Sequence, residues 1–130
     1  MRVLKTGLIG FGVVGQGFIR VLNKYINIFR GRYRVDIKVL YIIDPVKGSV
    51  YSGEGLELGM ILKYIDRDGS LKAHPKYLDV DSYRAIYDDD IDLVIEVTPT
   101  NLVDGEPGYS HIREALNNGK HVITSNKGPI

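Results

Sequence analysis

The chain has 130 residues, of which 44% are hydrophobic and 25% are charged, and its formal net charge is +1. This length suits one domain with a core, and the balanced charge gives no electrostatic reason to expect nucleic acid or a membrane as a partner. The lack of cysteine excludes disulfides, thiolate metal sites and a cysteine nucleophile. No apolar run approaches the roughly 20 residues that span a bilayer, and no signal peptide is recognisable, so we expect a cytoplasmic protein.

Apolar residues follow strand-like runs in some segments and helical spacing in others. From residue 14 to 29 they recur every three or four residues, as on one face of a long helix, and Arg30-Gly31-Arg32 predicts its end. Residues 46–80 give the weakest signal, because their glycines suggest a mobile loop. The predicted elements are, in order, a strand over residues 3–9, a helix over 14–29, a strand over 33–44, a short helix over 56–64, a helix over 82–87 capped by Asp81, a strand over 91–97, a helix over 109–118 and a strand over 121–124.

Strands and helices alternate along this chain. Parallel strands joined through helices by right-handed crossovers form a sheet with helices on both faces. The order therefore predicts an α/β fold with a Rossmann-type doubly wound parallel sheet, in which residues 1–130 form a single nucleotide-binding domain. Residues 126–130 resemble the entry to a further helix, so we expect a fragment of a longer protein or a split gene product.

A glycine-rich motif follows the first predicted strand. Residues 10–15 are Gly-Phe-Gly-Val-Val-Gly, the G-x-G-x-x-G pattern of dinucleotide-binding proteins, and a predicted helix follows. Gly10 permits a tight turn, Gly12 lets a pyrophosphate approach the backbone, and Gly15 lets the helix pack closely on the strand. Free N–H groups at the helix start would bind the phosphates. The expected cofactor-binding residues here are Gly10, Phe11, Gly12, Val13, Val14 and Gly15; the alternative is a glycine-rich turn without a ligand.

Asp44 closes the second predicted strand. A carboxylate there can accept hydrogen bonds from the ribose hydroxyls of an adenosine, and it would repel a 2′-phosphate. The nearby Lys47 could instead favour a 2′-phosphate. We therefore expect NAD or NADP as cofactor, with NAD favoured, and an ordinary Asp-Pro turn is the alternative interpretation.

Polar segments also follow the last two predicted strands. Ligands of doubly wound sheets bind beyond the carboxyl ends of the strands, so we expect Thr98, Pro99 and Thr100 to meet the nicotinamide ribose. Asn126, which we also expect to bind the cofactor, and Lys127 follow the last strand in the same topological position. A lysine there could pair with a substrate carboxylate, donate to a carbonyl oxygen that gains charge during hydride transfer, or shuttle a proton. The alternatives are a polar turn and a surface lysine.

The three histidines, His74, His111 and His121, show no metal-ligand spacing. For His111 and His121 a structural or exposed role is favoured over a ligand role. The glutamates at 54 and 57 and the aspartates at 88–90 have the pattern of a solvated surface. We therefore predict no metal site.

Together these motifs resemble homoserine dehydrogenase, over essentially the whole chain. The block at residues 121–129, His-Val-Ile-Thr-Ser-Asn-Lys-Gly-Pro, carries the resemblance most specifically. Residues 44–69, with Tyr-Ser-Gly-Glu-Gly-Leu at 51–56, resemble the archaeal-type branch. The other matching segments are residues 7–15, 97–101 and 105–108.

The resemblance implies reversible NAD(P)-linked interconversion of L-homoserine and L-aspartate 4-semialdehyde, in threonine and methionine biosynthesis. It implies that Lys127 is the catalytic lysine of the nucleotide domain. It further implies a second domain, absent from this chain, that supplies other catalytic groups and the contacts of a homo-oligomer, so that the chain alone would be inactive. Two alternatives stay open: a stand-alone NAD(H)-binding sensor without catalysis, and the cofactor domain of another Rossmann oxidoreductase.

Overall fold

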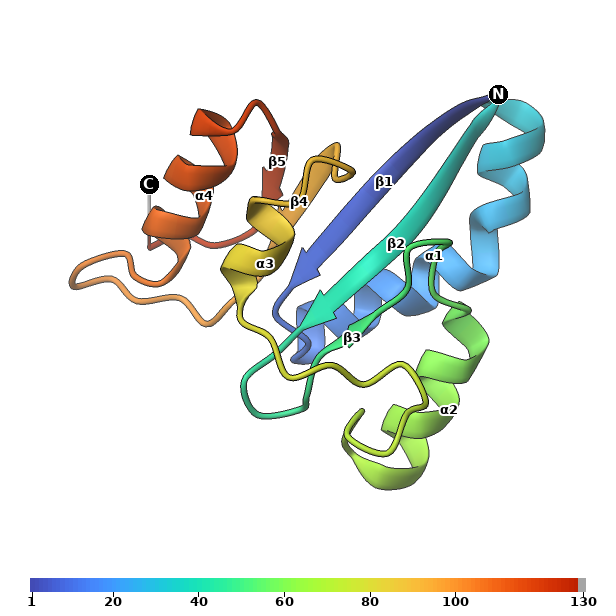
Figure 1. Cartoon of the computed structure of the whole chain (residues 1–130), viewed down its shortest axis with the longest axis horizontal. Helices are drawn as coiled ribbons and strands as arrows, with labels where there is room; N and C mark the ends of the chain where they lie inside the picture. Colours follow the sequence, from blue (N-terminus) through green and yellow to red (C-terminus); the bar gives the residue numbers. More distant parts are fainter. Residues whose placement is uncertain (129–130) are drawn as a thin grey trace.

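The computed structural model describes residues 1–128 (Figure 1). Its elements are, in chain order, β1 (Arg2–Ile9), α1 (Val13–Arg32), β2 (Val35–Ile43), β3 (Val50–Tyr51), α2 (Leu58–Asp68), α3 (Ser82–Ile86), β4 (Leu93–Glu96), α4 (Gly108–Asn117) and β5 (His121–Thr124). Every predicted strand and helix is present. The helix entry expected at residues 126–130 lies partly outside the described residues.

The five strands form one sheet in the order β3-β2-β1-β4-β5. β1 pairs in parallel with β2 and with β4, and β4 pairs in parallel with β5. The direction of chain progression reverses between β1 and β4, which is the switch point of a doubly wound sheet. The expected doubly wound α/β fold is confirmed, with one correction: the edge strand β3 is antiparallel to β2.

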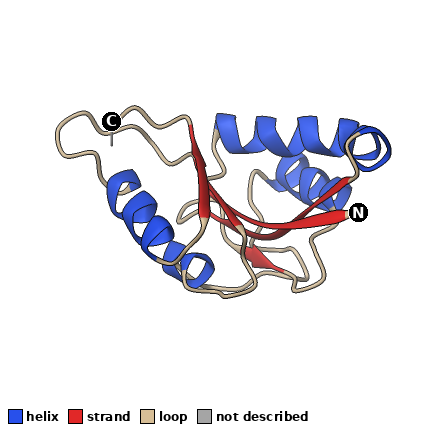
Figure 2. Cartoon of the chain, turned by 90° about the horizontal axis from the view of Figure 1, so that it is seen from above, coloured by secondary structure: helices blue, strands red, loops and turns tan. Residues whose placement is uncertain are grey.

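Helices cover both faces of the sheet (Figure 2). Side chains alternate between the two faces along each strand. Leu8 and Ile42 pack on one face with residues of α1 and α2. Ile9 and Tyr41 pack on the other face with residues of α3 and α4. The two apolar layers hold the strands in place, so the loops at the strand ends project from a rigid support.

Several element boundaries differ from the sequence prediction, most of all the ends of α1 and α2. α1 continues through Gly31 to Arg32, and the left-handed residue after it is Arg34, with φ 56°. α2 starts later and ends later than predicted, because the Glu57 carboxylate caps its first N–H groups and Gly69, with φ 64°, ends it. The predicted cap of α3 is confirmed, since Asp81 accepts the Tyr83 N–H.

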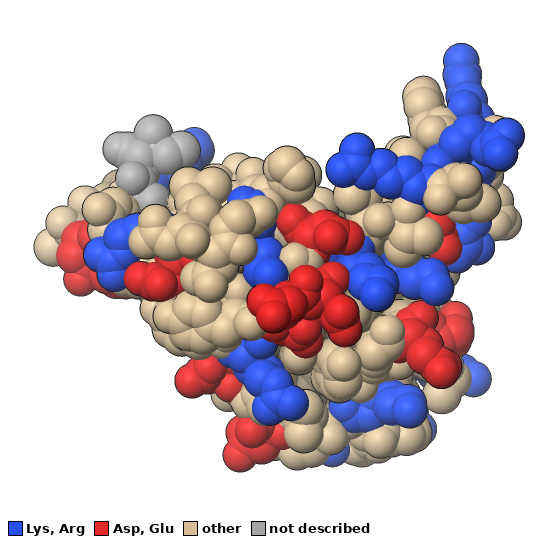
Figure 3. All heavy atoms as spheres, turned by 45° about the horizontal axis from the view of Figure 1, so that its top comes forward, with Lys and Arg blue, Asp and Glu red and all other residues tan. Residues whose placement is uncertain are grey.

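The face shown in Figure 3 carries acidic and basic side chains side by side, and basic ones gather at the end where α1 finishes. In residues 1–128, no helix is both long enough and apolar enough to cross a membrane.

Candidate functional site

The loops after β1, β2, β4 and β5 meet at one edge of the sheet, because the parallel strands all end there. A cavity of about 350 Å³ lies at this edge. The structure brings most of the residues predicted from sequence together around it. Its lining comprises Gly10, Gly12, Val13, Val14, Asp44, Val97, Thr98, Pro99, Thr100, Ser125 and Asn126.

The three glycines of the motif have different reasons for being glycine. At Gly10 φ is 103°, and a Cβ would lie 2.7 Å from the Val97 carbonyl oxygen. At Gly15 a Cβ would lie 2.3 Å from the Gly10 carbonyl oxygen. A Cβ at Gly12 would meet no atom within 4 Å. The fold itself therefore requires Gly10 and Gly15, whereas the space beside Gly12 is open to a ligand.

The N-terminus of α1 opens into this space. Gly12 is the N-cap, no side chain caps the helix, and its first turn contains no acidic residue. The side chains of Val13 and Val14 are exposed, at 91% and 53%. The first N–H groups of a helix have no partner within it and carry its positive partial charge. This helix end can therefore hold an anion such as a phosphate.

The Asp44 carboxylate joins two of the loops. One oxygen accepts the Phe11 N–H at 2.8 Å, and the other accepts the N–H groups of Val46 and Lys47, each at 2.8 Å. These hydrogen bonds, which connect the glycine loop to the loop after β2, were not predicted from the sequence. A carboxylate has about four acceptor positions, and Asp44 lines the cavity, so it can still accept hydrogen bonds from a ligand.

Three predicted residues do not line the cavity. Phe11 is fully buried in the core, with its N–H bound to Asp44 and its carbonyl oxygen bound to Gln16. The Phe11 side chain therefore packs in the core, and its expected contact with the cofactor stays a prediction. Gly15 is buried at the helix–strand contact. Lys127 is exposed beside the cavity, next to Asn126.

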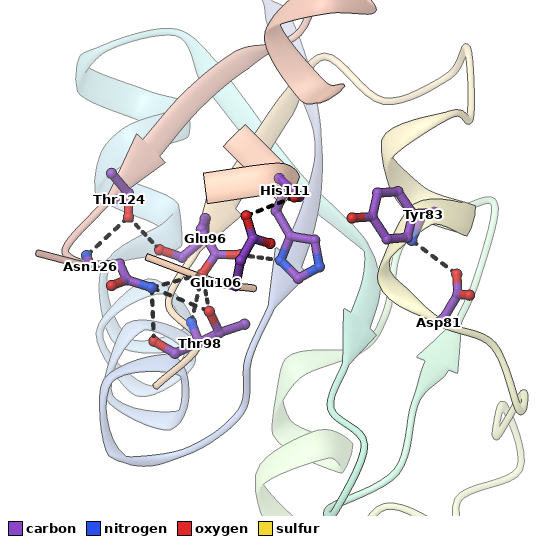
Figure 4. Close-up of polar contacts among 9 residues, drawn as sticks. Asp81, Tyr83, Glu96, Thr98, Glu106, His111, Thr124 and Asn126 are labelled. Atoms are coloured by element: carbon purple, nitrogen blue, oxygen red, sulfur yellow. Dashed lines mark hydrogen bonds and ion pairs between the residues drawn. The ribbon is translucent and has the colours of Figure 1, made fainter. Parts of the chain in front are cut away.

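A buried network of hydrogen bonds connects the ends of β4 and β5 (Figure 4). The Glu96 side chain is fully buried, and its Oε1 accepts the N–H of Thr98 at 2.8 Å and also the Thr98 hydroxyl. The side-chain amide nitrogen Nδ2 of Asn126 donates to the carbonyl oxygen and to the hydroxyl of Thr98, each at 3.3 Å. The two loops that line the cavity are thereby fixed to one buried carboxylate.

The same network anchors the chain around Lys127. The Thr124 hydroxyl donates to the Glu96 carbonyl oxygen at 2.8 Å and accepts the Asn126 N–H at 2.9 Å. The Asn126 side-chain oxygen accepts the Gly128 N–H at 3.0 Å. Lys127 therefore projects from a segment that is held on both sides.

Glu96 is also paired with a histidine. Its Oε2 lies 2.5 Å from Nδ1 of His111, which is buried on α4. Burial by itself raises the pKa of the Glu96 carboxyl, but the hydrogen bonds from His111 and Thr98 outweigh burial and hold its pKa below the ordinary value. Glu96 is therefore ionised at neutral pH. The sequence carried one signal for it, an acidic residue ending the otherwise apolar strand Leu-Val-Ile-Glu.

The other two histidines lie outside this network. His74 is buried, its Nδ1 accepts the Lys76 N–H at 2.9 Å, and burial lowers its pKa. His121 is exposed on β5. Within residues 1–128, no group of three or more His, Asp or Glu side chains is arranged to hold a metal ion.

A doubly wound sheet with G-x-G-x-x-G opening a helix beside a cavity at the strand ends defines a nucleotide-binding domain of the Rossmann class. Residues 10–130 match the family model described as homoserine dehydrogenase, NAD binding domain. The chain belongs to this family, which confirms the resemblance seen in the sequence.

Individual relatives agree with this family. Homoserine dehydrogenase of Methanocaldococcus jannaschii is 36% identical over 124 residues, covering 95% of this chain and 36% of that protein. The NAD(+)-dependent homoserine dehydrogenase of Pseudomonas canavaninivorans is 33% identical over 131 residues, which cover 100% of this chain and 37% of that protein. The fold is similar to a hyperthermophilic archaeal homoserine dehydrogenase mutant in complex with NADPH, with TM-score 0.79, 22% identity and coverage of 98% and 37%. The chain thus spans little more than a third of the length of these relatives.

Proposed function

We propose that residues 1–130 form the cofactor-binding domain of an NAD(P)-dependent homoserine dehydrogenase. The reaction is the interconversion of L-homoserine and L-aspartate 4-semialdehyde. A bound nicotinamide would supply the acceptor for a hydride from the alcohol carbon, and the hydroxyl proton would be released to water. Family membership and the uncapped N-terminus of α1, opening into a cavity at the strand ends, support the proposal. The pathway would be threonine and methionine biosynthesis.

Within the cavity, each segment has a distinct task. The N–H groups of Gly12, Val13 and Val14 bind the pyrophosphate at the helix end. Gly10 and Gly15 shape the loop, as their close contacts require. Thr98 and Asn126, which the Glu96 network holds in place, bind the nicotinamide side together with Pro99 and Thr100.

Asp44 takes the ribose of the adenosine half, and its negative charge favours NAD over NADP. Its carboxylate is already oriented by three backbone N–H groups, so little freedom is lost when a ribose hydroxyl binds. The relatives include one named as NAD(+)-dependent and one structure with NADPH. Support for NAD in this chain thus comes from Asp44.

Lys127 is the catalytic residue of this domain. It follows β5 beside the cavity, from a segment anchored through Asn126 and Gly128. Its ammonium group can bind a substrate carboxylate or donate to the oxygen that gains negative charge as the aldehyde is reduced. The other substrate-binding groups, and the contacts of a homo-oligomer, belong to the part of the relatives that this chain does not span. We expect this chain alone to bind cofactor without turnover.

Calorimetric titration of the chain with NADH tests the proposal. We expect saturable but weak binding, because the titrated residues 1–130 do not include the other substrate-binding groups proposed above, and competition by ADP-ribose, which carries the pyrophosphate and adenosine. Binding of neither compound at millimolar concentration would contradict the proposal.

A further inference from the structure

A second cavity, of about 600 Å³, adjoins the first. The two cavities share Gly10, Asp44, Thr98 and Pro99. The first continues toward Ser125 and Asn126, the side of Lys127, whereas the second continues past Asp44 toward α3 and α4. A dinucleotide whose pyrophosphate lies at Gly12 would therefore place its two halves in different cavities.

The second cavity has the walls of a site for a flat base. Apolar and aromatic side chains from three segments line it, and such surfaces bury rings well. They are Pro45 and Val46 after β2, Val80 and Tyr83 around the start of α3, and Pro99 and Pro107 from the loop between β4 and α4. Its charged lining groups are the carboxylates of Asp44, Asp79 and Asp81.

His111 adds a nitrogen to this cavity. Its Nδ1 bonds Glu96, and because an ionised carboxylate only accepts, Nδ1 carries the hydrogen. Nε2 has no hydrogen-bond partner in residues 1–128. The single buried side-chain polar atom without a partner in that part of the chain is Thr6 Oγ1, so Nε2 keeps access to the cavity that His111 lines.

The ring is held in place from both sides. Glu96 fixes one edge, and Tyr83 packs edge-on against the ring with centroids 5.4 Å apart. Figure 4 shows His111 lying between these two residues. A ring oriented in this way presents one defined nitrogen to a ligand at little entropic cost.

We propose that His111 binds the adenosine half of the dinucleotide through Nε2, with Glu96 as the positioning residue of the ring. This inference rests on the proposed function of the site. Adenosine offers hydroxyls, an exocyclic amine and ring nitrogens, so it matches a polar atom set in an apolar wall. Glu96 then orders both halves of the site, Thr98 and Asn126 through Oε1 and His111 through Oε2.

Two probes separate the halves in calorimetry. ADP-ribose contains the adenosine half without nicotinamide, and reduced nicotinamide mononucleotide contains the nicotinamide half without adenosine. His111→Phe keeps a ring against Tyr83 and removes both nitrogens. We expect this variant to bind ADP-ribose about tenfold more weakly, the effect of one hydrogen bond, and to bind the mononucleotide with unchanged affinity.

The matched control is His74→Phe. His74 is a buried histidine that packs on Tyr64 outside both cavities, so its variant should change the affinity for neither probe.

Nitrogen-15 NMR of the unmodified chain provides a measurement that does not depend on a variant folding. Saturating ADP-ribose should shift the Nε2 signal of His111 and leave His74 in place, and the mononucleotide should shift neither. Three results would overturn the inference while the proposed function stands: an Nε2 signal of His111 that does not shift, a His111→Phe variant with undiminished affinity for ADP-ribose, or one that loses affinity for both probes equally. If the unmodified chain bound neither probe, the inference and the proposed function would both be overturned.

Discussion

Gly12 is the residue of the glycine motif whose side-chain space the protein leaves empty. Because a Cβ there meets nothing within 4 Å, Gly12→Val fits the fold and fills only the space assigned to the pyrophosphate. We expect it to abolish NADH binding in calorimetry while the midpoint of thermal unfolding changes little. Gly17→Val is the control, since Gly17 lies on the same helix and is equally open. NADH affinity of the Gly12 variant equal to that of the unmodified chain would remove the loop from the site.

Gly15 should behave in the opposite way. A Cβ there would lie 2.3 Å from the carbonyl oxygen of Gly10, so Gly15→Ala forces α1 away from β1. Overpacking of this kind costs about 1–3 kcal/mol, measurable as a lower free energy of unfolding in urea. Gly17→Ala should instead leave stability equal or higher, because alanine favours a helix over glycine. Equal stability of the two variants would contradict the packing role of Gly15.

Asp44 joins two loops through its hydrogen bonds, and the proposed function also gives it a role in cofactor preference; the two roles can be tested separately. Asp44→Asn keeps one oxygen for the loop N–H groups and removes the charge that repels a 2′-phosphate. We expect the ratio of the dissociation constants for NADPH and NADH to fall several-fold, even if both affinities drop as the loops loosen. Asp89→Asn, an exposed acidic residue away from both cavities, should leave the ratio as it was. An unchanged ratio in the Asp44 variant would assign the preference to another residue.

At the scale of elements, the long segments were predictable. α1 repeats a helical period over many residues, and β2 is a long run rich in Val, Ile and Tyr. The two-residue strand β3 was not predictable, since two residues carry no period and its pairing with Tyr41 and Ile42 depends on the folded sheet. The bounds of α2 were missed for a local reason. Its cap is Glu57, and glutamate is not among the usual N-cap residues.

The end of β4 should make stability depend on pH. The pKa of Glu96 is below its ordinary value of about 4.3 because the hydrogen bonds from His111 and Thr98 outweigh its burial. A carboxyl with a depressed folded pKa contributes stability above the ordinary value and loses it as pH falls through the folded pKa. Below about pH 4, the free energy of unfolding should therefore fall more steeply for the unmodified chain than for Glu96→Gln, as measured by urea unfolding from pH 7 to pH 3. If the free energies of unfolding of the two proteins fell in parallel with pH, the hydrogen bonds to the Glu96 carboxylate would not stabilise the fold.

Over the whole molecule, the sequence located the cavity but not the network beneath it. Thr98 and Asn126 could be placed together because parallel strands end at one edge of a sheet. His111 could not, since its pairing with Glu96, 15 residues earlier, depends on how α4 packs against β4. A lone histidine on a helix is compatible with burial, exposure or ligand binding, and only the packed structure decides among them.

We expect a Lys127 variant to separate cofactor binding from the proposed chemistry. Lys127 is exposed and lies outside the cavity lining, so Lys127→Ala should leave the fold and NADH affinity of this chain nearly intact. Turnover can be assayed in a chimera that joins the chain to the remainder of the Methanocaldococcus jannaschii homoserine dehydrogenase. There the variant should lower kcat for homoserine oxidation by about 10²–10³, the effect of losing one charged donor at a developing oxyanion.

The chimera with Lys127 is the reference, and Lys120→Ala is unsuitable as a control because that side chain bonds the Asp88 carbonyl oxygen. Lys24→Ala, on the exposed surface of α1, serves instead and should leave kcat unchanged. A Lys127 variant that turns over like the reference would show that Lys127 is a surface lysine and that the reacting oxygen is served by another group.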